Sequence, residues 1–449
     1  MTFKLLLVYL FSLTLTNAYA WVYGQRVQFS EMLFLVLFIF WIKDLIKTKQ
    51  LPQDTGLNKP FLLFVFFCIL SFFNSINLFL SSAELLGTLY LFIMLILVVH
   101  IVDSKEKLDI IIKTWIGILS LVLILGLGGL FLSLLTGQKN IFCWVYQGNY
   151  PYIKNAYRIT SIFHNPLALA NYLIISFAFV ASDLLLTQDK KYRTFLKILM
   201  VFMCLTMLAT VSREILSFII AAFLVYSYFY KKKVVKFKIM RFLSIILIVV
   251  IFVYITIFCS AFYISSGKVK DSLKKPDREL SVNINYAYIT KLGYKIAALE
   301  MVKRHPFLGV GLKMYRSYLQ KLNSENYFYK RDIIPLYEYA IGYKYSTSLR
   351  INDPHNDVLQ YFAETGIFGG CAFIFFLGTF LYIILTNLKD KKLDDQYFKV
   401  RLFCFLASFI GILVESIDLD VFKLRFVWFL MALALALIKI HKNQAKRIT

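Results

Sequence analysis

The sequence lacks the cysteine and histidine groupings that mark disulfide-bonded and metal-binding proteins. Its six cysteines stand singly, at 68, 143, 204, 259, 371 and 404, without a CxxC pair or a His/Cys cluster of metal-ligand spacing. No internal repeat and no long Gly/Ser-rich or Pro-rich linker divides the chain. We therefore expect neither a disulfide framework nor a metal site.

Apolar residues are abundant instead. They make up 59% of the 449 residues, aromatic residues make up 17%, and the mean hydropathy is +0.68. Apolar runs of roughly 18 to 25 residues recur along the chain, and each is long enough to cross a hydrocarbon core about 30 Å thick. Since backbone groups in lipid must be paired within each segment, these runs predict an all-α polytopic membrane protein.

The charge is strongly basic, with 50 Lys and Arg against 26 Asp and Glu, a net charge of +24. Much of it lies in short loops between apolar runs, where Lys and Arg mark the cytoplasmic side, so we expect no nucleic-acid partner. The pattern predicts a multi-pass protein of the bacterial inner membrane with both termini in the cytoplasm. About twelve transmembrane helices are expected, near residues 4–22, 29–46, 59–80, 84–103, 108–135, 158–183, 195–212, 214–230, 240–266, 356–385, 399–416 and 420–440.

The first 20 residues allow a second interpretation. A basic residue, an apolar stretch and Ala18-Tyr19-Ala20 are also typical of a cleavable signal peptide. We favour a retained helix, and cleavage would leave every later orientation unchanged.

Two loops are expected on the outer side. The loop at 137–157 carries four aromatic residues typical of an interfacial belt, namely Trp144, Tyr146, Tyr150 and Tyr152. The loop at 267–352 is the only one large enough for a periplasmic subdomain, so we divide the chain into 1–266, 267–352 and 353–449. Helical periodicity at 287–304, stopping at His305-Pro306, predicts a helix in this loop, with a second short helix through Leu322.

The large loop holds sixteen Lys and Arg against seven Asp and Glu, a net charge of 16 − 7 = +9. This excess would attract an anionic substrate or lipid head group, or it is a solvated basic surface.

The segment at 352–370 is the most informative one for chemistry. Asp353 is expected as an N-cap and Pro354 as the first helical residue, which puts His355 in the opening turn of a membrane helix. The positive end of the helix dipole disfavours imidazolium, so His355 suits a general base. Gly366 and Gly369 lie within about 40° of the His355 face, leaving it smooth for a lipid chain or a neighbouring helix. The alternative is a capping or interfacial histidine.

The spacing His355-Asn356, nine residues, then Gly366-x-x-Gly369 resembles the signature of the bacterial O-antigen ligase family of membrane glycosyltransferases. Three further segments resemble family motifs in the same order: 158–166 with Arg158 and Asn165-Pro166, 210–213 with Ser212-Arg213, and 305–311 with Pro306 and Gly309-Val310-Gly311. Departures from the family pattern are Ser161, Leu167, Lys291 and Lys295.

This resemblance implies transfer of a glycan from undecaprenyl pyrophosphate to an acceptor hydroxyl on lipid A-core or another glycan, at the periplasmic face. It implies no metal, nucleotide sugar or other cofactor. His355 would be the base and Arg158 and Arg213 would bind the pyrophosphate, because the planar guanidinium contacts phosphate oxygens bidentately. Asn356, Gly366, Gly369 and Asn165 would support the site.

Other interpretations remain open. Each arginine also fits a snorkelling interfacial role, while His164 suits a structural polar contact and His305 a helix stop. An O-antigen polymerase would share the architecture and much of the chemistry. From another class, a lipid-oligosaccharide flippase or transporter would also be basic and helical, although such proteins place ionisable residues near the midplane of two corresponding halves.

Overall fold

A computed structural model describes most of the chain. The described residues are 1–22, 25–49, 52, 54–146, 156–232, 245, 248, 282–325, 327, 353–390 and 395–448. They are mostly helical. The helices are α1 (Thr2–Thr14), α2 (Phe29–Thr48), α3 (Asn58–Leu70), α4 (Leu78–Ile101), α5 (Lys105–Thr136), α6 (Pro166–Leu186), α7 (Lys190–Ala209), α8 (Ile215–Lys232), α10 (Val282–Arg304), α11 (Tyr315–Ser324), α14 (Asp357–Lys389), α15 (Gln396–Glu415) and α16 (Arg425–Ile448), with a short 3₁₀ helix at Ser71–Asn74.

Seven of the described helices are long and apolar enough to cross a membrane: α4, α5, α6, α7, α14, α15 and α16. Three shorter apolar helices lie at Thr2–Thr14, Asn58–Asn74 and Ile215–Tyr230. The all-α polytopic class agrees with this architecture. The count of twelve stays a prediction, and nearly all of the expected span at 240–266 falls outside the described residues.

Two β-hairpins replace segments that were expected to be loop or helix. β1 (Tyr19–Val22) pairs with β2 (Gln25–Gln28), so the first helix ends at Thr14 and the prediction of helix to residue 22 is wrong. β3 (Cys143–Tyr146) pairs with β4 (Ala156–Ile159), with Trp144 opposite Arg158. Arg158 therefore lies on a strand. The expectation from the sequence that a helix begins at Arg158 is wrong.

The helix after β4 begins at Pro166, with Asn165 as its N-cap. The Asn165 side chain accepts a hydrogen bond from the Ala168 amide at 2.7 Å, and proline is tolerated at the first helical position because its missing donor is not needed there. The span expected at 158–183 therefore begins at Pro166, eight residues later than expected.

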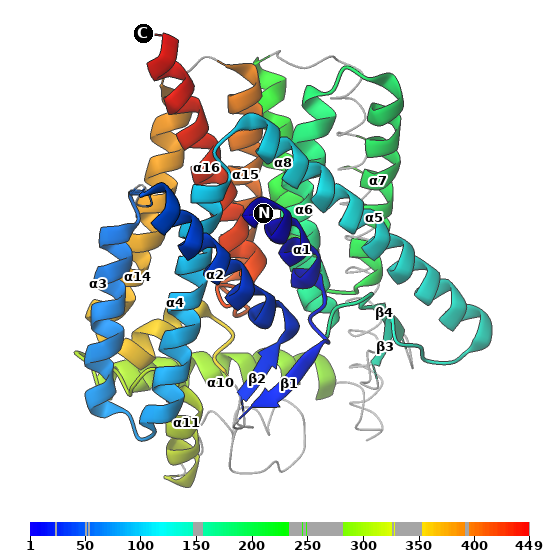
Figure 1. Ribbon diagram of the computed structural model, residues 1–449. Helices are drawn as coiled ribbons and strands as arrows, with labels where there is room; N and C mark the ends of the chain where they lie inside the picture. The colour runs from blue at the N-terminus through cyan, green and yellow to red at the C-terminus, as the bar shows by residue number, and fades with distance from the viewer. Residues whose placement is uncertain are drawn as a thin grey trace.

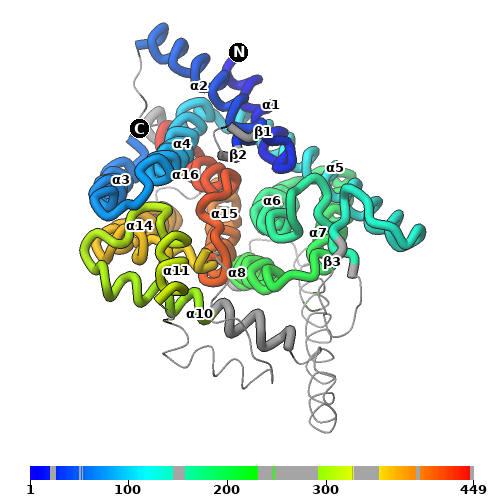
Figure 2. Tube along the Cα trace, turned by 90° about the horizontal axis from the view of Figure 1, so that it is seen from below, coloured from blue at the N-terminus to red at the C-terminus, as the bar shows by residue number. Residues whose placement is uncertain are grey.

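α15 lies near the centre of the bundle and packs against α6, α8, α14 and α16 (Figure 2). α6 is almost entirely buried. Near the start of α15, the buried Arg401 guanidinium lies 2.9 Å from Asp183 on α6 and 2.7 Å from Asp109 on α5. A buried cation is tolerated only when it is paired in this way, so these ion pairs fix α5, α6 and α15 together.

Both hairpins, α10 and α11 lie at one end of the bundle, opposite the C-terminus (Figure 1). α10 ends at Arg304 and α11 runs through Ser324, which confirms the two helices expected in the large loop. These helices share a small apolar core of their own, built around Met301, Tyr315 and Leu319 and touching α14 at Ala363. We call this end of the bundle the hairpin end.

Candidate active site

His355 lies immediately before α14 at the hairpin end. Its backbone is left-handed, with φ +51°, and its ring centroid is 6.2 Å from that of Tyr294 on α10. The helix N-cap is Asn356, whose side chain accepts a hydrogen bond from the Leu359 amide at 2.8 Å. The prediction that Asp353 caps the helix and that Pro354 begins it is therefore wrong by three residues. His355 precedes the opening turn.

Asp353 has a different partner. Its carboxylate receives two hydrogen bonds from the Arg316 guanidinium, at 2.9 and 2.5 Å, which is the bidentate geometry that arginine favours. Burial alone would raise the pKa of Asp353, but the bonds from Arg316 outweigh it and hold this pKa below its usual value. The pair fastens α11 to the segment that leads into His355.

Asn356 and Asp357 hold the loop between α15 and α16, residues 416–424, which we call the α15–α16 loop. The Asn356 side chain donates to the Ile417 carbonyl at 2.9 Å, and the Asp357 amide donates to the Ser416 carbonyl at 3.2 Å. The Asp357 carboxylate accepts from the Val421 amide at 2.8 Å and the Phe422 amide at 3.3 Å. The residues directly after His355 thus bind a loop that is distant in sequence.

Gly366 breaks α14, with φ +74° and ψ −177°. In an unbroken helix the carbonyls of Ala363 and Glu364 would accept from residues 367 and 368. Here they accept instead from the Val310 and Gly311 amides at 2.9 and 3.0 Å, while the Ile367 amide donates to the Pro306 carbonyl at 2.8 Å. The connector between α10 and α11, residues 305–314, therefore docks into the break.

The glycines where the connector contacts α14 have no room for a side chain. A Cβ on Gly366 would lie 2.2 Å from the Phe307 carbonyl oxygen, and one on Gly309 would lie 2.4 Å from Glu364 backbone. A Cβ on Gly369 would meet the Thr365 side chain at 2.1 Å. The two glycines were expected to let a lipid chain or a neighbouring helix approach closely; at Gly366 the segment that approaches is the connector, which is protein but not helical. The two glycine motifs of the sequence are the two sides of one contact.

The two predicted arginines converge on one turn between α7 and α8. Arg158 Nε donates to the Thr210 carbonyl at 2.7 Å. Arg213, three residues later, is half-exposed, and its guanidinium lies 3.3 Å from the Asp418 carboxylate on the α15–α16 loop. Lys295 on α10 lies 3.6 Å from the same carboxylate. The α15–α16 loop thus contacts Arg213, in the turn between α7 and α8, and also binds Asn356 and Asp357 beside His355.

The other two candidate histidines have structural surroundings. The His164 amide donates to Thr16 Oγ1 at 2.8 Å, and its ring Nδ1 lies 3.2 Å from the same hydroxyl. His305 follows the last residue of α10, and its ring Nε2 is 3.1 Å from the Tyr318 hydroxyl. Burial, with Lys321 and Arg304 nearby, lowers the pKa of His305.

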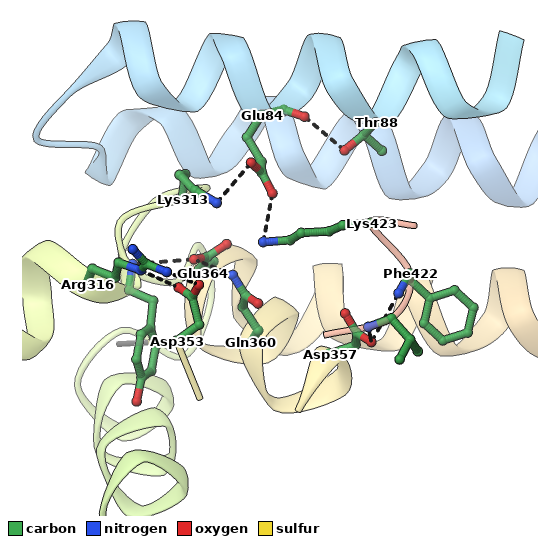
Figure 3. A network of polar contacts seen from close by, with 12 residues as sticks. Glu84, Thr88, Lys313, Arg316, Asp353, Asp357, Gln360, Glu364, Phe422 and Lys423 are labelled. Atoms are coloured by element: carbon green, nitrogen blue, oxygen red, sulfur yellow. Dashed lines mark hydrogen bonds and ion pairs between the residues drawn. The ribbon is translucent and has the colours of Figure 1, made fainter. Parts of the chain in front are cut away.

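Sequence reasoning missed a network of charged residues around the start of α14 (Figure 3). Glu84 on α4 lies 3.0 Å from Lys423 of the α15–α16 loop and 3.2 Å from Lys313 of the connector. Glu364 and Gln360 of α14 lie beside them, joined by a 3.1 Å hydrogen bond. The only signal in the sequence was a few charges at the ends of apolar runs, and nothing there showed that they meet.

Asp420 of the same loop is half-buried. Burial raises the pKa of Asp420 and Asp353 raises it further, while Lys423, His355 and Lys313 oppose the shift. The His355 imidazole therefore lies within electrostatic reach of this carboxyl group. In the described part of the chain, no three His, Cys, Asp or Glu side chains are grouped as metal ligands would be.

This geometry gives one end of the bundle a histidine, two arginines and a set of fixed carboxylates. A family model described as O-antigen ligase matches residues 198–374. The match includes Arg213, the connector, His355, Asn356, Gly366 and Gly369, and it leaves out Arg158, Asn165 and the α15–α16 loop. None of the curated proteins compared with the chain matches it significantly. Over the residues that build the site, this chain is therefore similar to the O-antigen ligase family.

Proposed function

We propose that the protein transfers a glycan from undecaprenyl pyrophosphate to a hydroxyl of lipid A-core at the periplasmic face of the inner membrane. The observation that carries this proposal is the link from His355 to Arg213. Asn356 and Asp357, next to His355, bind the α15–α16 loop, and Asp418 of that loop pairs with Arg213. A proton acceptor and a phosphate-binding group are thus attached to one loop.

In this mechanism His355 accepts the proton of the acceptor hydroxyl as its oxygen attacks the anomeric carbon of the glycan. The bond between that carbon and the pyrophosphate oxygen breaks, and the pyrophosphate leaves with the lipid carrier. Arg213 stabilises the negative charge that develops on the leaving group, because guanidinium groups bind phosphate oxygens bidentately. Arg158 holds the Thr210 carbonyl and so shapes the turn that presents Arg213.

The half-exposed position of Arg213 supports this role. The Arg213 side chain is 48% exposed, so a phosphate can approach the guanidinium from solvent or from the lipid interface. The Asp418 carboxylate lies 3.3 Å from the same guanidinium. Asp418 would orient the arginine in the absence of substrate.

The direct test is to incubate the purified protein with an undecaprenyl-pyrophosphate-linked glycan and lipid A-core. We expect a lipid A-core product carrying the glycan. Longer lipid-linked chains without that product would identify a polymerase instead. A protein that only moves the lipid-linked glycan across a vesicle membrane, without forming either product, would be a flippase, and the proposal would fail.

A further inference from the structure

Lys423 lies in the α15–α16 loop and extends from it toward carboxylates of other segments (Figure 3). Its ammonium group is 3.0 Å from one carboxylate oxygen of Glu84 on α4. The other oxygen of Glu84 is 3.2 Å from the ammonium group of Lys313. Glu84 therefore joins three segments: a membrane helix, the connector from the outer loop, and the α15–α16 loop.

The residues beside Lys423 are fixed to the start of α14. Val421 and Phe422 donate their amides to the Asp357 carboxylate, and Glu84 holds the next residue from the other side. Asp357 is only two residues after His355. A shift of Lys423 would pull on Asp357, and through it on the segment that carries His355.

Lys423 also provides the positive charge for this cluster. The acidic groups that face it are Glu84 on α4, Asp353, Asp357, Tyr361 and Glu364 on or before α14, and Asp420 on its own loop, while Lys313 is a second cation nearby. Burial disfavours the charged form of Lys423, but the acidic groups around it outweigh burial and raise the pKa of Lys423. Its positive charge in turn opposes the rise in the pKa of Asp420, a carboxyl group that interacts electrostatically with His355.

We propose that Lys423 is a positioning residue for His355, acting through the Glu84 ion pair that fixes the α15–α16 loop and through its charge on the carboxylates around the histidine. This inference rests on the proposed function, in which His355 must be neutral to accept a proton. A neutral residue at 423 would leave the surrounding carboxylates uncompensated, and these would favour the protonated imidazolium.

The first test is the pH profile of glycan transfer by Lys423→Met, Lys423→Arg and Glu84→Gln. Removing the cation should raise the pKa of the base, so the rising limb of the K423M profile should move to higher pH by roughly half a unit to one unit. E84Q removes a negative charge, so its limb should move to lower pH. K423R keeps the charge, and its limb should stay in place. Lys439→Met is the matched control, since Lys439 is a half-buried lysine of α16 that contacts the Val99 carbonyl away from this site.

A purely structural role would reduce the rate in these variants without moving the limb in opposite directions. Unchanged limbs in both K423M and E84Q would therefore overturn the electrostatic part of the proposal. Thermal unfolding in detergent identifies any variant that fails to fold.

The second test needs no substrate. Hydrogen exchange of the peptide containing the Val421 and Phe422 amides should become at least about tenfold faster in K423M, because the loop loses its attachment to Glu84. K439M should leave this exchange unchanged. If the wild type transfers no glycan, the proposed function fails, and this exchange still decides whether Lys423 fixes the loop. Wild-type exchange in K423M would refute the inference even if the protein is an active transferase.

Discussion

Arg213 is the residue that we propose binds the pyrophosphate of the donor. Its guanidinium is half-exposed and contacts the partly exposed Asp418 at 3.3 Å. Such a pair contributes little to folding, because exposed ion pairs are worth about 0–1 kcal/mol. In the proposed mechanism, the contact with Asp418 would fix the direction of the guanidinium before the substrate binds.

We predict that Arg213→Ala lowers the rate of glycan transfer by roughly 100-fold, as expected for loss of a group that stabilises a developing charge. Arg213→Lys should remain at least about tenfold below wild type, because an ammonium group cannot make the bidentate contact. Initial rates under saturating acceptor measure both variants. Full activity of the lysine variant would reduce the role of Arg213 to charge alone.

The Asn356 side chain makes two hydrogen bonds through two different atoms. Its side-chain oxygen caps α14, and its side-chain nitrogen donates to Ile417 in the α15–α16 loop. Asn356→Asp keeps an oxygen for the cap and loses the donor to the loop.

We therefore expect Asn356→Asp to lose about 1 kcal/mol of stability, the usual net value of one hydrogen bond, and to lose more than tenfold in transfer rate. Asn356→Ala removes the cap as well and should melt at a lower temperature than the aspartate variant. Thermal unfolding and transfer assays on both variants separate the two roles. Equal activity of Asn356→Asp and wild type would contradict a role for the loop bond.

At the scale of the secondary-structure elements, the broken helix α14 organises the hairpin end. Its break at Gly366 frees the Ala363 and Glu364 carbonyls to bind the connector. The connector then places Lys313 beside Glu84 and precedes Arg316, which binds Asp353. One glycine conformation thus positions several charged groups.

Gly366→Ala should destabilise the protein by about 2 kcal/mol or more. The left-handed φ is strained for alanine, and the alanine Cβ would overlap the Phe307 carbonyl. Gly378→Ala in the same helix is the control. Nothing lies within 4 Å of a Cβ at Gly378, so this change should be neutral or slightly stabilising. Thermal unfolding compares the two, and equal melting temperatures would contradict the packing described for Gly366.

These elements also show where sequence reasoning succeeds and where it stops. The spacing of His355, Asn356, Gly366 and Gly369 marked residues that the fold does use, and helical periodicity predicted α10 and α11. Capping was misjudged because Asp353, Pro354 and Asn356 all suit a helix start, and only the tertiary contacts of Asp353 with Arg316 and of Asn356 with Ile417 decide among them. The Glu84–Lys423 pair joins residues distant in sequence, and no local pattern records it.

At the scale of the whole molecule, the elements expected outside the membrane lie together. The two hairpins, α10 and α11 are at one end of the bundle, while α14 runs from that end toward the end where the C-terminus lies (Figure 1). The distribution of basic loops predicts that the hairpin end faces the periplasm.

Cysteine labelling tests this orientation. In a background with all six native cysteines replaced, Ser324→Cys on α11 should react with a membrane-impermeant reagent in cells whose outer membrane is permeable. Lys190→Cys, at the start of α7, should react only after the inner membrane is lysed. The reverse pattern would invert the topology and place His355 and Arg213 on the cytoplasmic face, away from the proposed substrate.

The most direct measurement of the central claim is glycan transfer by purified wild-type protein and by His355→Ala, with lipid-linked glycan and lipid A-core as substrates. Loss of a general base should lower the rate by about 10²–10⁴-fold while the variant keeps the expression, membrane insertion and unfolding temperature of the wild type. This result would support His355 as the proton acceptor. Wild-type rates of transfer in the His355→Ala protein would contradict the account.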